Sequence, residues 1–177
     1  LYAATWDRHR TVAALMGGGP GTALYRSDDG GENWTKLTNG LPKSNMGKIG
    51  ITISPQNPDV VYAAIELDRT QGAVYRSSNR GASWTKMSDT VSGGTGPHYY
   101  QELYASPHEF DRLYLMNVRV LTSGDGGKTF VQLKEQDKHS DNHAIVFKKD
   151  DPNYIMLGTD AGIYETFDNA ETWRYIK

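Results

Sequence analysis

The chain of 177 residues carries 19 lysines and arginines against 21 aspartates and glutamates, a formal net charge of −2, and has no cysteine. A small, dispersed charge lacks the basic footprint of a nucleic-acid-binding protein. Without cysteine, a disulfide framework and cysteine-based metal or nucleophile chemistry are excluded. No apolar run is long enough to span a bilayer, so no membrane span is predicted in this segment. The length predicts one domain of ordinary size. No cofactor is expected.

The first predicted element, residues 1–4, aligns with residues 61–64, since Leu-Tyr-Ala-Ala matches Val-Tyr-Ala-Ala. Residues 61–64 are expected to form the second strand of their unit, so the first unit lacks its first strand. We therefore expect the chain to be a segment of a longer one. The loop at residues 6–22 follows, with Asp7, Arg8 and a glycine-rich run. This run lacks the Lys-Ser/Thr of a phosphate-binding loop and opens no helix, which favours a mobile rim loop.

An eight-residue pattern then occurs four times, its third positions 50, 46 and 43 residues apart. Each copy has a hydroxyl residue, then Asp or Asn, then Gly or Ala, then a large aromatic residue. The copies are Ser27, Asp29, Gly31 and Trp34; Ser77, Asn79, Gly81 and Trp84; Ser123, Asp125, Gly127 and Phe130; Thr166, Asp168, Ala170 and Trp173. The spacing predicts stacked supersecondary units. Calcium binding is an alternative, but one carboxylate per turn is too few.

Each copy is expected to form a tight turn between two strands. The Asp or Asn oxygen can accept backbone N–H groups, and glycine tolerates the positive φ that closes the turn. Ala170 occupies the glycine position of the fourth copy, which predicts either a negative φ or strain there. The aromatic residue is expected to cover the seam with a neighbouring sheet, and removal of Trp34 or Trp84 to cost about 3–5 kcal/mol.

The remaining segments supply the other strands of each unit. Alternating apolar residues and intervening turns predict strands, and no helical period of useful length occurs. The predicted strands are 48–54, 60–65, 73–76 and 84–87; 99–105, 113–117, 120–122 and 130–133; 144–147, 154–158, 162–165 and 173–176. The predicted fold is all-β: a β-propeller segment of about four blades of four antiparallel strands, with an incomplete first blade. The blades span residues 1–38, 45–88, 97–134 and 141–177 within one domain.

The repeated turn resembles the Asp-box, or BNR repeat, of sialidase-like, xyloglucanase-like and sortilin-like β-propellers. The closest resemblance is to bacterial exported sortilin-like or glycosyl-hydrolase-like Asp-box proteins, which the stretches 18–21, 47–51 and 139–143 also resemble. The resemblance implies that the box joins the third and fourth strands of each blade. It also implies an extracytoplasmic location, whether periplasmic, cell-surface or secreted. Sortilin-like propellers bind peptides and proteins, so a protein, peptide or glycan ligand is expected.

Candidate site residues lie on the face opposite the boxes, where loops from several blades converge. His139, Asp141 and His143 alternate, so an extended backbone would place all three on one side. They could bind zinc, hold a sugar or carboxylate, or form a polar rim that bonds to neighbouring loops and water. Further candidates for ligand binding are His98, Tyr99, Tyr100, Asp7 and Arg8.

Catalysis would require two carboxylates across a scissile bond, one with a raised pKa. Glu102, Asp141 and Asp160 are available, but nothing in their spacing selects a pair. The sialidase Arg-Ile-Pro element is absent. The favoured function is therefore a binding or scaffolding segment whose partners include the rest of its own propeller. A xyloglucanase-like glycoside hydrolase and a structural subunit of a large extracytoplasmic complex remain alternatives.

Overall fold

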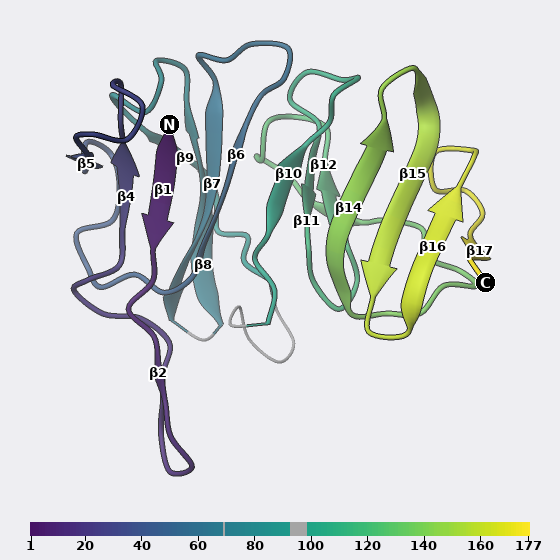
Figure 1. Ribbon diagram of the computed structural model, residues 1–177, viewed down its shortest axis with the longest axis horizontal. Helices are drawn as coiled ribbons and strands as arrows, with labels where there is room; N and C mark the ends of the chain where they lie inside the picture. The colour runs from purple at the N-terminus through teal and green to yellow at the C-terminus, as the bar shows by residue number, and fades with distance from the viewer. Residues whose placement is uncertain (69, 93–98) are drawn as a thin grey trace.

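The computed structural model describes residues 1–68, 70–92 and 99–177. These residues form strands and turns, with no helix among them. Four antiparallel sheets of three or four strands form the body of the described structure: β1 (Tyr2–Thr5), β4 (Ala23–Arg26) and β5 (Thr35–Leu37); β6 (Ile49–Ile53), β7 (Val61–Asp68), β8 (Gln71–Ser77) and β9 (Thr85–Ser88); β10 (Leu103–Ala105), β11 (Leu113–Leu115), β12 (Leu121–Ser123) and β13 (Val131–Gln132); β14 (Asn142–Lys148), β15 (Asp151–Thr159), β16 (Gly162–Thr166) and β17 (Arg174–Tyr175). In Figure 1 the sheets follow one another in chain order, from purple to yellow.

The first sheet has three strands, in the order β1-β4-β5, whereas the other three sheets have four consecutive strands each. The all-β propeller segment with an incomplete first blade is therefore confirmed. Between β1 and β4 the chain forms a short hairpin of β2 (His9–Arg10) and β3 (Leu15–Met16), which projects away from the sheets in Figure 1. The loop at residues 6–22, for which the sequence predicted no strand, thus contains a pair of two-residue strands.

Three separate hydrophobic cores lie between successive sheets, and central strands supply residues to two of them. Along β7, Val61, Ala63 and Ile65 face the first sheet, while Tyr62 and Ala64 face the third. This is the period of two that a strand buried on both faces requires. Each sheet is therefore held mainly by the sheets next to it, as expected for a repeat array.

The first strands of successive sheets approach closely, and Gly50 on β6 makes this possible. A Cβ at Gly50 would lie 1.7 Å from the carbonyl oxygen of Gln101. Gln101 is itself buried and has a φ of 96°, in the left-handed region. Because this residue turns the backbone, β10 begins at Leu103, and the strand predicted over residues 99–105 is shorter than expected.

The four repeated turns share one hydrogen-bond pattern. In the second turn, Ser77 Oγ donates to Asn79 Oδ1 over 2.9 Å and accepts the Gly81 N–H over 2.8 Å. Asn79 Oδ1 also accepts the Ser83 N–H over 2.9 Å. The corresponding bonds recur in the turns that begin at Ser27, Ser123 and Thr166. The short side chains thus satisfy backbone donors that a turn leaves unpaired.

The same bonds change the acidity of the turn carboxylates. The Thr129 backbone N–H and side-chain hydroxyl hold the pKa of Asp125 down at about 2, and the Thr172 hydroxyl does the same for Asp168. In an unfolded chain the pKa of Asp is near 3.9. The two carboxyl groups therefore lose their protons more readily in the folded state than in the unfolded state. The stability that the ionised carboxylates add to the fold is fully present at neutral pH. It is lost as pH falls through about 4 towards 2.

We expect Asp125→Asn to weaken this acid sensitivity while keeping the turn, because Asn79 forms the same turn without a charge. Urea unfolding midpoints at pH 7 and pH 3 measure the effect. The difference between the two midpoints should be smaller in Asp125→Asn than in wild type. An unchanged difference would show that the Asp125 carboxylate does not contribute to acid unfolding.

The glycine position of every turn has a positive φ: 105° at Gly31, 79° at Gly81, 93° at Gly127 and 71° at Ala170. The fourth turn therefore keeps the left-handed conformation with an alanine, at the cost of strain. Of the two interpretations of Ala170, strain is the one that the structure supports. A Cβ at Gly81 would also lie 3.0 Å from Leu37 Cδ1, whereas one at Gly31 would meet nothing closer than 3.6 Å.

We expect Gly31→Ala to lower the free energy of unfolding by about 1 kcal/mol, since only the backbone conformation is disfavoured. Gly81→Ala should cost about 2–3 kcal/mol, because the new methyl group also crowds Leu37 in a packed core. Chemical denaturation of the two variants tests the difference. Equal losses would show that crowding at Gly81 is relieved without cost.

The aromatic residues at the last position of the repeated turn differ in their exposure to solvent, although they occupy the same position in the sequence pattern. Trp84 is 5% exposed and Trp173 7% exposed, but Trp34 is 43% exposed. Trp84 packs in the core between the first and second sheets. Among the described residues, the first sheet has a four-stranded sheet on one side only, so Trp34 lacks the neighbour that Trp84 has (Figure 1). The expectation that Trp34 is as deeply buried as Trp84 is therefore wrong.

Candidate functional site

The loops expected to carry function lie along one edge of the array. In Figure 1 the hairpin β2–β3 and the β15–β16 turn lie at the lower edge, while the turns before β5 and β17 lie above them. We call this lower edge the rim. Two groups of polar and aromatic side chains lie near this edge, and each group joins residues from different sheets.

The first group links the segment before β10 to the start of β14. Tyr100 Oη donates to Asp141 Oδ1 over 2.5 Å, and the Tyr100 ring stacks on His143 with centroids 5.5 Å apart. His143 Nε2 lies 2.7 Å from Asp160 Oδ1, so this ring nitrogen carries a hydrogen and donates it to the carboxylate. The Asp160 N–H in turn donates to the Asp141 carbonyl over 3.2 Å. We call these four residues the rim cluster.

The arrangement differs from the extended one that the alternation predicted. Asp141 has a φ of 63°, and β14 begins only at Asn142 with a register shift just after it. His139, Asp141 and His143 are therefore not on one side of a regular strand. His139 Nδ1 instead lies 2.8 Å from the Ser140 carbonyl. Within the described ranges, no three His, Asp or Glu side chains come together as a group that could hold a metal.

A buried ion pair supports the loop that leads into the rim cluster. Lys138 Nζ lies 2.6 Å from Glu135 Oε1, and both side chains are almost fully buried at 0% and 1% exposed. Glu135 also accepts the Val120 N–H over 3.1 Å and an N–H from Asn142 Nδ2 over 2.9 Å. Lys138 Nζ donates to Asn142 Oδ1 over 2.5 Å. Sequence reasoning missed this network, because charged loop residues ordinarily face water and nothing in their spacing indicates burial.

The second group lies between the first, second and third sheets. Lys48 Nζ is 2.5 Å from Glu102 Oε1 and 5.7 Å from the centroid of the Trp6 ring. Arg8 lies over the same ring at 5.3 Å. The Glu66 carboxylate is buried and accepts the Lys48 N–H over 2.9 Å. Trp6 and Lys48 are not among the candidates predicted from sequence, although Trp6 opens the loop at residues 6–22 that was expected at the rim.

The other candidates have varied environments. Asp7 accepts the Gly21 N–H over 3.2 Å, so it ties the two ends of its loop together. Tyr99 is 47% exposed, and its ring centroid lies 6.4 Å from that of Tyr100. His98 lies outside the described residues.

The three candidate catalytic carboxylates all have protein partners. Glu102 pairs with Lys48, Asp160 with His143, and Asp141 with Tyr100. The Tyr100 hydroxyl and, after it, the Ser140 hydroxyl lower the pKa of Asp141. A general acid in glycoside hydrolysis requires the opposite change, a raised pKa. At neutral pH Asp141 is therefore ionised and accepts hydrogen bonds.

Comparison with solved structures shows a β-propeller fold. The GH74 xyloglucanase from Xanthomonas campestris aligns with a TM-score of 0.66 and 21% identity over 87% of this chain. The GH74 enzyme from Niastella koreensis gives 0.64 and 18% over 88%. YCF48 from Cyanidioschyzon merolae gives 0.54 and 17% over 78% of this chain and 39% of its own length. A sialidase, Hadza microbial sialidase Hz136, gives 0.52 and 13%, over 88% of this chain and 40% of its own.

This chain covers only 26% of the Niastella koreensis enzyme and 27% of the Xanthomonas campestris enzyme. No protein-family model matches the chain, and no curated protein sequence matches it. At these identities the similarity establishes the fold, and catalytic function has to be argued from the site itself.

Proposed function

We propose that this chain is a non-catalytic binding or scaffolding segment of a larger, extracytoplasmic, sortilin-like Asp-box propeller protein. Its rim loops would be presented to a protein, peptide or glycan. The observation that carries the proposal is the state of the rim carboxylates. Each is bonded to a neighbouring side chain, and the pKa of Asp141 is lowered by its partners. These are the properties of a fixed polar surface and not of an acid–base pair.

The rim cluster has the chemistry of a recognition surface. Its side chains come from the segment before β10, the start of β14 and the β15–β16 turn, and hydrogen bonds between them fix their positions. The side chains of His143 and Asp160 are 39% and 65% exposed. A ligand could therefore stack against Tyr99 and exchange hydrogen bonds with His143 and Asp160. Such preorganisation lowers the entropy lost on binding.

Further propeller blades are the first partner that we propose. The chain covers about a quarter of the two GH74 enzymes that it resembles in fold. The outer face of the first sheet also leaves Trp34 much more exposed than Trp84 or Trp173. A neighbouring blade would cover this ring as the first sheet covers Trp84.

The binding role is tested by selecting ligands and then changing the rim. A peptide-display library and a glycan array serve as probes for the purified chain. For any ligand recovered, we expect His143→Ala to weaken binding at least tenfold, because it removes the ring stacked on Tyr100 and the partner of Asp160. His108→Ala is the matched control, since His108 contacts the Lys148 carbonyl elsewhere. Equal affinity in wild type and His143→Ala for every ligand would refute a role for the rim cluster.

A further inference from the structure

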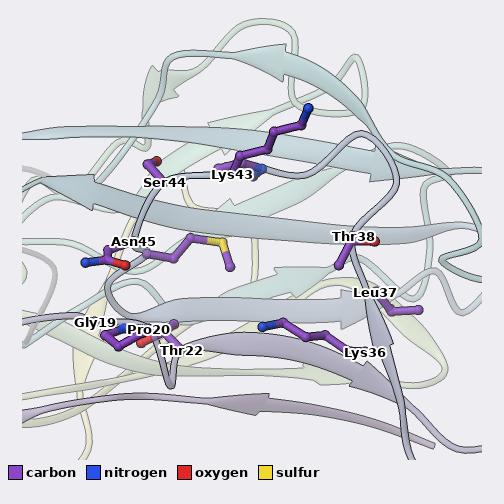
Figure 2. Close-up of a pocket in the computed structure, with 11 residues that line it drawn as sticks. Gly19, Pro20, Thr22, Lys36, Leu37, Thr38, Lys43, Ser44 and Asn45 are labelled. Carbon is purple, nitrogen blue, oxygen red and sulfur yellow. The ribbon is translucent and has the colours of Figure 1, made fainter.

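A groove in the first unit lies apart from the rim cluster and has a different chemistry. It has a volume of about 460 Å³ and lies between the turn at residues 19–22, the strand β5 and the connector at residues 38–46 (Figure 2). Its polar lining includes Thr22, Thr38, Ser44 and Asn45, together with Lys36 and Lys43. No acidic and no aromatic residue lines it.

The backbone and the core define the shape of this groove. The Gly19 N–H donates to the Met46 carbonyl over 3.2 Å, which joins the turn to the connector. Leu41 and Met46 anchor the connector in the core between the first two sheets. Gly40 has a φ of 83°, and a Cβ there would lie 1.9 Å from the Trp84 carbonyl oxygen. The groove is therefore largely formed before any ligand arrives.

The groove carries positive charge that the protein does not neutralise. Within the described residues, neither Lys36 nor Lys43 forms an ion pair, whereas most other described lysines and arginines do. The nearby carboxylate of Asp7 is outside the lining and accepts the Gly21 N–H. Charge of one sign in a concave surface attracts a ligand of the opposite sign. The ligand is therefore expected to be anionic.

The positions of the two lysines favour an extended ligand. In Figure 2, Lys36 reaches toward the turn that carries Pro20 and Thr22, while Lys43 projects in another direction. Two separated ammonium groups suit several carboxylates along a chain better than a single phosphate. The lining also lacks the aromatic platform on which sugar rings stack.

A backbone edge beside the groove favours a peptide. Within the part of the chain that the structure describes, β5 pairs only with β4, so its outer N–H and C=O groups have no strand partner there. An extended peptide can bond to such an edge and place alternate side chains in a neighbouring groove. We propose that the groove binds an extended acidic peptide segment, with Lys36 and Lys43 as its charge partners. The inference rests on the proposed binding role and assigns it a second site with a defined class of partner.

Fluorescence anisotropy with a labelled octapeptide of alternating Glu and Thr tests this site. We expect wild-type chain to bind the peptide, with an affinity that falls as salt increases. The double variant Lys36→Gln/Lys43→Gln should lose at least tenfold in affinity. Lys149→Gln should bind within twofold of wild type, because Lys149 is also an exposed lysine without an ion pair among the described residues, and it lies in the turn after β14, away from the groove lining. An octapeptide of alternating Lys and Thr should not bind.

Three results would overturn the inference. Wild-type chain that fails to bind the Glu-Thr peptide refutes it, and the proposed function still stands if ligands selected from the libraries depend on His143. Equal losses in the double variant and Lys149→Gln would show non-specific charge attraction. Binding of an oligouronate, and not of the peptide, that is lost in the double variant would assign the groove to an anionic glycan.

Discussion

Trp84→Ala should lower the free energy of unfolding by about 3–5 kcal/mol, the usual loss for a buried aromatic residue cut back to alanine. Trp84 is 5% exposed, and its ring fills the core between the first two sheets. Its Nε1 also donates to the Gly81 carbonyl over 3.1 Å, so its removal leaves a buried acceptor unpaired as well as a cavity. Denaturant unfolding followed by circular dichroism measures this loss.

Trp34→Ala is the control within the same chain. Trp34 makes the same bond, from Nε1 to the Gly31 carbonyl over 3.0 Å, but 43% of it is exposed. Because the Trp34 ring buries much less apolar surface than the Trp84 ring, we expect Trp34→Ala to lower the free energy of unfolding by only about 1–2 kcal/mol. Equal losses for the two variants would contradict the assignment of Trp84 to a seam between blades.

Lys138→Met should be the other strongly destabilising change, with a loss of about 3–5 kcal/mol. It leaves the Glu135 carboxylate buried without its counter-charge, since both side chains are almost fully buried. Burial already lowers the pKa of Lys138, against the effect of its partner Glu135. Asn142 loses a bond at the same time, so the loop that leads to Asp141 should loosen.

The double variant Glu135→Gln/Lys138→Met separates charge from packing. Its neutral amide can keep an acceptor for the Val120 N–H without a buried charge. We therefore expect the double variant to be more stable than Lys138→Met alone. Free-energy losses that add for the two sites would show that the ion pair contributes no coupling.

Local sequence patterns predicted those parts of the fold that are determined locally. Hydroxyl, carboxylate and glycine residues at fixed spacing act within one turn, so the four turns could be located from sequence alone. The alternation of Ile49, Ile51 and Ile53 likewise predicted a strand, which the structure shows as β6.

Features that depend on distant residues could not be predicted in this way. The exposure of Trp34 depends on which sheet lies beside it. The positive φ of Asp141 accompanies backbone bonds to Val118 and Asp160, neither of which is a neighbour in sequence. The groove also depends on residues that are distant in sequence, because it forms where the turn at Gly19 meets the connector at Met46. The rim cluster and the groove can therefore be recognised only once the packing of the blades is known.

The most direct test of a non-catalytic rim is turnover of xyloglucan, measured as release of reducing ends by the purified chain. We predict no release by wild type above the level of Glu102→Gln or Asp141→Asn. Circular dichroism of the three proteins would establish that each is folded. Release by wild type that is abolished in either variant would contradict the binding role and would identify that carboxylate as catalytic.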